Sequence, residues 1–156
     1  MKHIVSALSV LSLLLAISAC APVNGNMKCV DSDCWLRNDS IHLSITTLDS
    51  GSFARMMAVR VLHTYPMQEI WLGFRETIRN DSCRTEKGIR KMRFRLAGAD
   101  GQLSERGLNY AEYTFPVDTI KMSTRDTLDV TIFHYMPTDT IKGVSEVGWI
   151  IEKIDN

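Results

Sequence analysis

The sequence lacks an excess of charge of either sign. Its 156 residues include 18 Lys and Arg against 18 Asp and Glu, and the sequence pI is near 6.9. A general nucleic-acid binder needs a clear excess of Lys and Arg to release counterions from phosphate, so this class is excluded. With only four prolines and 45% hydrophobic residues, the chain is also neither collagenous nor disordered. The composition is that of one ordinary folded domain.

The usual motifs of catalysis and metal binding are missing as well. The chain contains no G-x-S-x-G nucleophile elbow and no phosphate-binding G-x-x-x-x-G-K-[ST] or G-x-G-x-x-G. His42, His63 and His134 fall within or beside predicted strands and have no H-x-H or H-E-x-x-H spacing. A metal site would require them to meet across sheets, and half-exposed strand histidines are the favoured interpretation. We therefore expect no enzyme activity, no metal and no cofactor.

No apolar run is long enough to span a membrane as a helix. A short positive start precedes the uncharged stretch Ile4 to Ile17, which falls short of the roughly 20 residues that a spanning helix needs. This pattern predicts a secretory signal over residues 1–19. Ile17-Ser18-Ala19-Cys20 resembles the lipobox of bacterial lipoproteins, so we expect acyl chains on Cys20 to hold the mature chain on a membrane. The alternative is a free or disulfide-bonded Cys20 after ordinary cleavage.

The residues after the lipobox are predicted to be a tether. Ala21 to Asn26 is rich in Pro, Gly and Asn, so residues 20–34 are expected to form a lipidated N-terminus and a flexible tether. Some lipoproteins carry an acidic cluster directly after the lipidated cysteine as a surface-export signal, and none is present here. We therefore expect the protein to face the periplasm within the cell envelope.

Besides Cys20, the mature chain has Cys29, Cys34 and Cys83. In an oxidising envelope these three predict one disulfide and one free thiol. The bond either joins Cys29 to Cys34 or joins one of these to Cys83.

Period-two alternation of apolar residues dominates the rest of the chain and predicts strands. The clearest case is Arg90 to Leu96, which has Met92, Phe94 and Leu96 on one side and Lys91, Arg93 and Arg95 on the other. We expect about seven strands and no amphipathic helix. Residues 35–156 are therefore predicted to be a single all-β domain, an antiparallel β-sandwich in immunoglobulin-like or jelly-roll style.

Charge is segregated along this domain. Between residues 75 and 95 eight basic residues stand against three acidic ones, and between residues 98 and 140 seven acidic residues stand against three basic ones. One interpretation is that Lys91, Arg93 and Arg95 form a docking face for an acidic partner. The other is that charges on adjacent strands pair with each other. Trp71 and Tyr110 are candidates for sugar stacking, which makes a glycan-binding module the alternative function.

Three segments together resemble the gliding motility lipoproteins of the GldH type. They are the lipobox with its short tether, the run Val59 to Pro66 continuing into Glu69-Ile70-Trp71-Leu72, and Gly143 to Lys153 near the C-terminus. The resemblance implies a membrane-anchored envelope lipoprotein associated with gliding motility and its linked secretion machinery. It implies a role in protein interaction with an envelope partner and brings no catalytic residues.

Overall fold

The computed structural model describes residues 23–80, 82–105 and 107–154. The predicted signal over residues 1–19 and the lipidation site Cys20 lie outside this part of the chain. Within the described ranges, no helix is long and apolar enough to cross a membrane.

The described chain is built of antiparallel strands. Eleven strands follow one another, β1 (Val23–Cys29), β2 (Trp35–Leu36), β3 (Ile41–Thr46), β4 (Gly51–Leu62), β5 (Glu69–Arg79), β6 (Arg84–Glu86), β7 (Arg90–Arg95), β8 (Tyr110–Met122), β9 (Thr127–His134), β10 (Thr140–Ile141) and β11 (Val144–Lys153).

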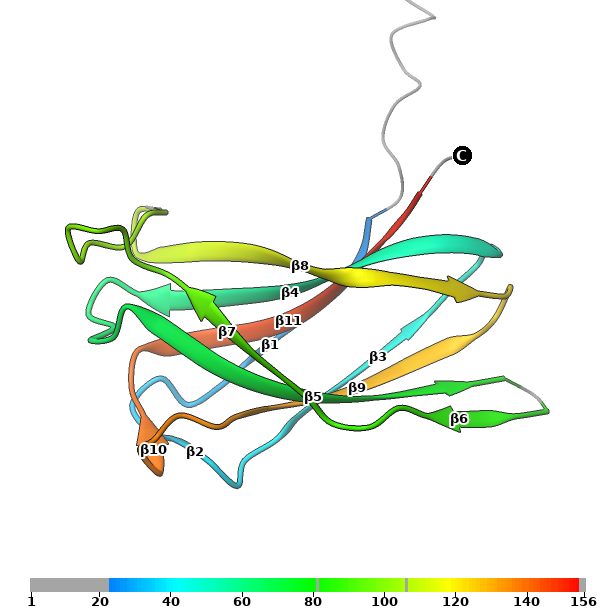
Figure 1. Ribbon diagram of the computed structural model, residues 1–156, viewed down its shortest axis with the longest axis horizontal. Coiled ribbons are helices and arrows are strands. Elements are labelled where there is room, and N and C mark those ends of the chain that lie inside the picture. The colour runs from blue at the N-terminus through cyan, green and yellow to red at the C-terminus, as the bar shows by residue number, and fades with distance from the viewer. Residues whose placement is uncertain (1–22, 81, 106, 155–156) are drawn as a thin grey trace, which may run out of the picture.

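Two large sheets face each other (Figure 1). The four-stranded sheet has the order β1-β11-β4-β8. In the five-stranded sheet β3 pairs with β9 and β9 with β5, while β7 and β6 pair with successive parts of the other edge of β5. Strands β2 and β10 form a small separate ribbon. The predicted all-β sandwich is therefore confirmed.

Alternation along the strands creates the core between the sheets. Along β9 every second residue, from Leu128 to His134, is buried, and Met57, Val59 and Val61 of β4 are fully buried in the opposite sheet. The ring centroids of Phe74 and Trp149 lie 4.7 Å apart between the layers. Burial of such side chains contributes roughly 25 cal/mol per Å² of apolar surface, so this interior is the main source of stability.

The structure corrects two expectations about the elements. The seven predicted strands correspond to β3, β4, β5, β7, β8, β9 and β11, and four further strands raise the described count to eleven. The expected tether over residues 20–34 is wrong for residues 23–29, because β1 pairs along its whole length with β11, from Val23 opposite Glu152 to Cys29 opposite Glu146. The folded domain thus begins at residue 23 in the described chain rather than at residue 35.

Candidate functional site

Strand β7 presents its basic residues to solvent. Phe94 is buried and Met92 is half-buried on the inner side, whereas Lys91, Arg93 and Arg95 are exposed on the outer side. The alternation predicted for this strand is therefore present.

Aromatic side chains lie beside these cations on the same outer face. The register places Arg93 opposite Trp71 of β5 and Lys91 opposite Gly73. On the next strand Phe133 lies opposite Gly73, and the backbone N–H of Tyr135 donates to the Trp71 carbonyl over 3.0 Å.

Gly73 makes room for the aromatic row. A Cβ atom at this position would lie only 2.4 Å from the Phe133 ring, so the ring occupies the space that a side chain would fill. Trp71 and Tyr135 lie with their ring centroids 5.7 Å apart. Trp71, Phe133 and Tyr135 are half-buried and form a continuous strip across two strands.

Two of the three cations contact this strip directly. The Arg93 guanidinium carbon lies 4.9 Å from the Trp71 ring centroid, and Lys91 Nζ lies 5.2 Å from that of Tyr135. Arg95 Nε donates to the Ala97 carbonyl over 2.9 Å. We call these six residues, Lys91, Arg93, Arg95, Trp71, Phe133 and Tyr135, the basic aromatic face. Cation–π contacts hold Lys91 and Arg93 over the rings, whereas Arg95 is held by its hydrogen bond to Ala97.

Other cations of the five-stranded sheet, including Arg90 at the start of β7, behave differently from Lys91, Arg93 and Arg95. Arg79 donates to Asp129, Arg90 to Asp118 over 2.6 Å, and Arg75 lies 3.6 Å from Glu86. Hydrogen bonding to Arg79 is the main reason that the pKa of Asp129 lies below its ordinary value. Within the described ranges, Lys91, Arg93 and Arg95 have no such carboxylate. The second sequence interpretation, pairing between adjacent strands, thus applies to Arg75 and Arg79. A docking face at Lys91, Arg93 and Arg95 stays a prediction.

A shallow pocket adjoins the basic aromatic face at Trp71. It has a volume of about 340 Å³ and a mainly apolar lining that includes Met67, Met136 and Pro137. Arg37 lies at its rim, because its Nη2 donates to the carbonyls of Met136 and Pro137. The lining also includes Glu69, whose Oε2 accepts a hydrogen bond from Trp71 Nε1 over 3.1 Å.

The two candidate sugar-stacking residues are not brought together. Trp71 lies on the outer face of the five-stranded sheet, while Tyr110 begins β8 of the other sheet. The Arg60 guanidinium lies 4.9 Å from the Tyr110 ring centroid and also binds Glu112 and Glu146. A stacking platform made of both rings is therefore absent.

The three histidines have separate surroundings. His42 bonds to Thr131, His63 Nε2 lies 3.1 Å from the Gly107 carbonyl, and His134 is fully buried against Trp35. Burial lowers the pKa of His134, although its bond to the Trp35 carbonyl acts in the opposite direction. In the part of the chain that the structure describes, no three His, Cys, Asp or Glu residues gather as a metal site.

The expected disulfide between Cys29 and Cys34 is not formed. Both thiols are free and exposed, as is that of Cys83. Cys29 lies at the end of β1 with its Sγ 3.7 Å from Glu146, and Cys34 follows a turn in which its N–H donates to the Asp31 carbonyl. Pairing of β1 with β11 fixes Cys29 against the four-stranded sheet, and no local sequence pattern indicated this pairing.

A buried ion network was not predicted from the sequence. Arg55 of β4 points between the sheets, is 2% exposed and binds Glu76 of β5, which is 1% exposed. Arg55 and Arg90 also bind Asp118 at the open edge. Burial of Asp118 acts to raise its pKa, but the two arginines outweigh this effect and lower it. One sequence feature could have indicated it. Arg55 alternates in step with Phe53 and Met57, which places all three on the same, inward-facing side of β4.

The profile of the family described as GldH lipoprotein matches residues 23–151, from β1 to β11. The chain belongs to this family. The resemblance inferred from the sequence is therefore confirmed. Membership of this family indicates a gliding-motility-associated lipoprotein, and a lipoprotein is anchored to a membrane of the cell envelope.

Other comparisons add no function. A search of curated proteins found no match to this GldH-family chain. Two crystal structures of murine APRIL each cover 83% of this chain and 98% of their own. One is 8% identical with a TM-score of 0.35, and the other is 9% identical with a TM-score of 0.34.

Proposed function

We propose that this lipoprotein is a non-enzymatic component of the cell envelope that docks an acidic protein partner through the basic aromatic face. Acyl chains on Cys20 hold it on a membrane, with the sandwich facing the periplasm. The partner belongs to machinery for gliding motility and its linked secretion, as the family suggests.

The observation that carries this proposal is the contrast among the cations of the five-stranded sheet. Arg75, Arg79 and Arg90 pair with carboxylates of this chain, whereas Lys91, Arg93 and Arg95 have none among the described residues. Rings in contact with cations give such a surface both apolar area and charge, a combination enriched at protein interfaces.

A charge-reversal experiment tests the docking face. Lys91→Glu, Arg93→Glu and Arg95→Glu are combined, and partners are crosslinked in intact cells and recovered from membranes. A matched control reverses three exposed lysines that lie elsewhere, Lys28, Lys121 and Lys142. We expect the first variant to lose a crosslinked partner that the wild type and the control retain. An unchanged partner profile in a folded triple variant would contradict the proposal.

Glycan binding remains the alternative, carried by the half-buried Trp71 and its neighbouring pocket. A glycan array decides between the two. Binding that is lost in Trp71→Ala and kept in the triple charge reversal would favour the glycan, because cations are not needed to stack a neutral sugar.

The lipid anchor has its own test. Cys20→Ala should release the protein from membranes and abolish acyl labelling, since the acyl chains are proposed to supply the stable attachment. If the variant stays on membranes and neither form is labelled, the proposed anchoring is wrong.

A further inference from the structure

One leucine projects from a turn that is firmly held. Leu48, between β3 and β4, is 81% exposed, while its neighbour Thr47 is fully buried. Thr47 N–H donates to the Asp126 carbonyl over 2.9 Å, and its hydroxyl donates to the Ser123 carbonyl over 2.8 Å. The Arg125 N–H donates back to the Thr47 carbonyl over 2.8 Å. Leu48 is thus presented on an ordered support, which lowers the entropy lost when it binds.

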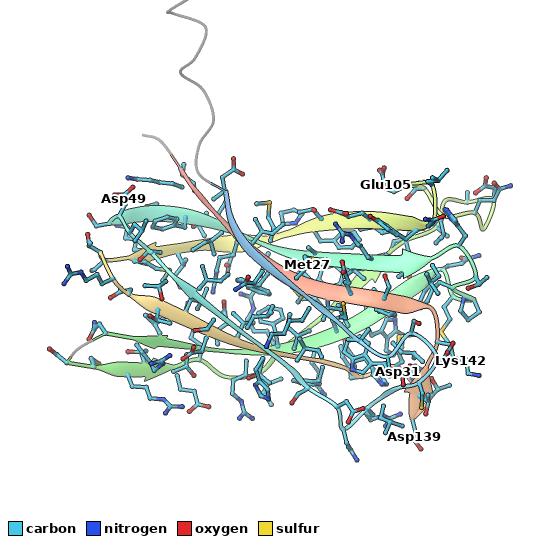
Figure 2. The ribbon with its side chains drawn as sticks, turned by 180° about the vertical axis from the view of Figure 1, so that it is seen from behind. Met27, Asp31, Asp49, Glu105, Asp139 and Lys142 are labelled. Carbon is cyan, nitrogen blue, oxygen red and sulfur yellow. The ribbon has the colours of Figure 1, made fainter. Side chains whose placement is uncertain are left out.

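The start of β1 lies on the same side of the molecule as this turn. Val23 pairs with Glu152, the next residue Lys153 places its Nζ 3.4 Å from Asp49 Oδ2, and Ile154 N–H donates to the Ser52 carbonyl over 2.9 Å. Figure 2 shows Asp49 on the side where β1 begins, with Asp139 on the far side.

The lipid anchor leaves little distance between this side and a membrane. Only Ala21 and Pro22 separate Cys20 from the first residue of β1. Three residue steps span at most about 10 Å even when fully extended. Because β1 is paired from Val23 onward, an acylated Cys20 keeps the beginning of the sandwich within that distance of the lipid.

We infer that this side of the sandwich, comprising the turn from Thr47 to Ser50, Arg125 and Ile154, rests on the lipid surface with Leu48 in the headgroup region. The inference rests on the lipidation of Cys20 proposed above. An exposed leucine beside an exposed arginine suits the boundary between acyl chains and phosphates. Ile154, 38% exposed, adds apolar surface at the same place.

This orientation also places the basic aromatic face. Figure 1 shows the beginning of β1 and the end of β11 leaving the sandwich on the side away from the lower strands β5, β9 and β6. The outer face of the five-stranded sheet therefore lies on the side of the sandwich opposite to the beginning of β1, and it stays open to a periplasmic partner.

Fluorescence quenching by brominated lipids tests the contact. Leu48→Trp and a control, Leu36→Trp, are made in the full lipidated chain and reconstituted into vesicles of phosphatidylethanolamine and phosphatidylglycerol with brominated or unbrominated acyl chains. Leu36 is 43% exposed on β2 and pairs with Thr140. Thr140 follows Asp139, which lies on the side of the molecule away from Asp49. The measured quantity is the tryptophan emission of each variant minus that of the wild type. For Leu48→Trp we expect bromination of the lipids to reduce this difference about twofold, because interfacial side chains reach the acyl boundary. For Leu36→Trp we expect no change.

Quenching that is equal in the two variants, or absent in Leu48→Trp, overturns the inference. Flotation with the vesicles separates this failure from that of the anchor. If the wild type floats and Cys20→Ala does not, the anchor stands and only the membrane contact is wrong. If the wild type does not float, the lipidation fails and the inference fails with it.

Discussion

At the scale of single residues, Arg55 and Glu76 form a buried ion pair between the two sheets. Arg55→Met should cost about 3 kcal/mol in the free energy of unfolding, because it leaves a carboxylate buried without its cation. The double variant Arg55→Met/Glu76→Leu should recover most of that loss, since neither charge remains. Urea unfolding of the wild type, both single variants and the double variant measures this coupling. A double variant as unstable as Arg55→Met would contradict the argument.

The cysteines give a second prediction at this scale. Cys29, Cys34 and Cys83 are free and exposed, so each should react with a maleimide in the folded protein without reductant. Mass spectrometry of the soluble Cys20→Ala variant should show three additions. Cys83→Ser should reduce the number to two. A single addition to the Cys20→Ala variant would restore the disulfide expected from the sequence.

At the scale of elements, alternation located the long strands and failed for the short ones. β2, β6 and β10 have only two or three residues, too few to show a period. β1 has the sequence VNGNMKC, which reads as a loop, and it is a strand because β11 offers an edge to pair with. Pairing between distant segments is a tertiary effect, and local sequence does not contain it.

The same limit applies to the candidate site. Alternation in β7 predicted Lys91, Arg93 and Arg95 on one face, but the register with β5 and β9 brings Trp71, Phe133 and Tyr135 beside them. Phe133 was missed although Leu128, Val130 and Ile132 implied that it faces outward. Its contact at Gly73 depends on cross-strand register, which a single sequence does not fix.

Gly148 is expected to control whether β1 stays attached. A Cβ atom there would lie 2.6 Å from the Asn26 carbonyl oxygen and 2.2 Å from Met27 Sδ. The first of these is backbone and cannot move without disturbing the β1–β11 ladder. Gly148→Ala should therefore destabilise the fold by about 1–3 kcal/mol, the usual cost of overpacking.

Hydrogen exchange of the β1 amides measures this effect. Protection of residues 25–29 should fall more than that of β4, which pairs with β11 on its other side. Gly88→Ala is a suitable control, because a Cβ there meets no atom within 4 Å. Equal loss of protection in β1 and β4 would show that the substitution acts on the whole sheet instead.

At the scale of the whole molecule, the near-zero formal charge is the sum of differently placed parts. Some of the basic excess in residues 75–95 is neutralised by the later acidic segment, through Arg79 with Asp129 and Arg90 with Asp118. Among the described residues Lys91, Arg93 and Arg95 form no ion pair, and these three share one face of β7. A neutral protein thereby acquires a local field that can select an acidic partner without binding polyanions in general.

The whole molecule should also lose stability in acid, in two steps. Burial lowers the pKa of His134 in the fold, so below about pH 6.5 the unfolded chain takes up a proton that the native state does not. The pKa values of Asp118 and Asp129 are lowered as well, so a second loss begins below about pH 4, as these carboxylates are protonated in the unfolded chain. Urea unfolding of the Cys20→Ala variant from about pH 7.5 to about pH 3 measures both steps. Adding His134→Phe should remove the first step and leave the second, because a phenyl ring packs against Trp35 without titrating. If the first step survives this substitution, a group other than His134 causes it.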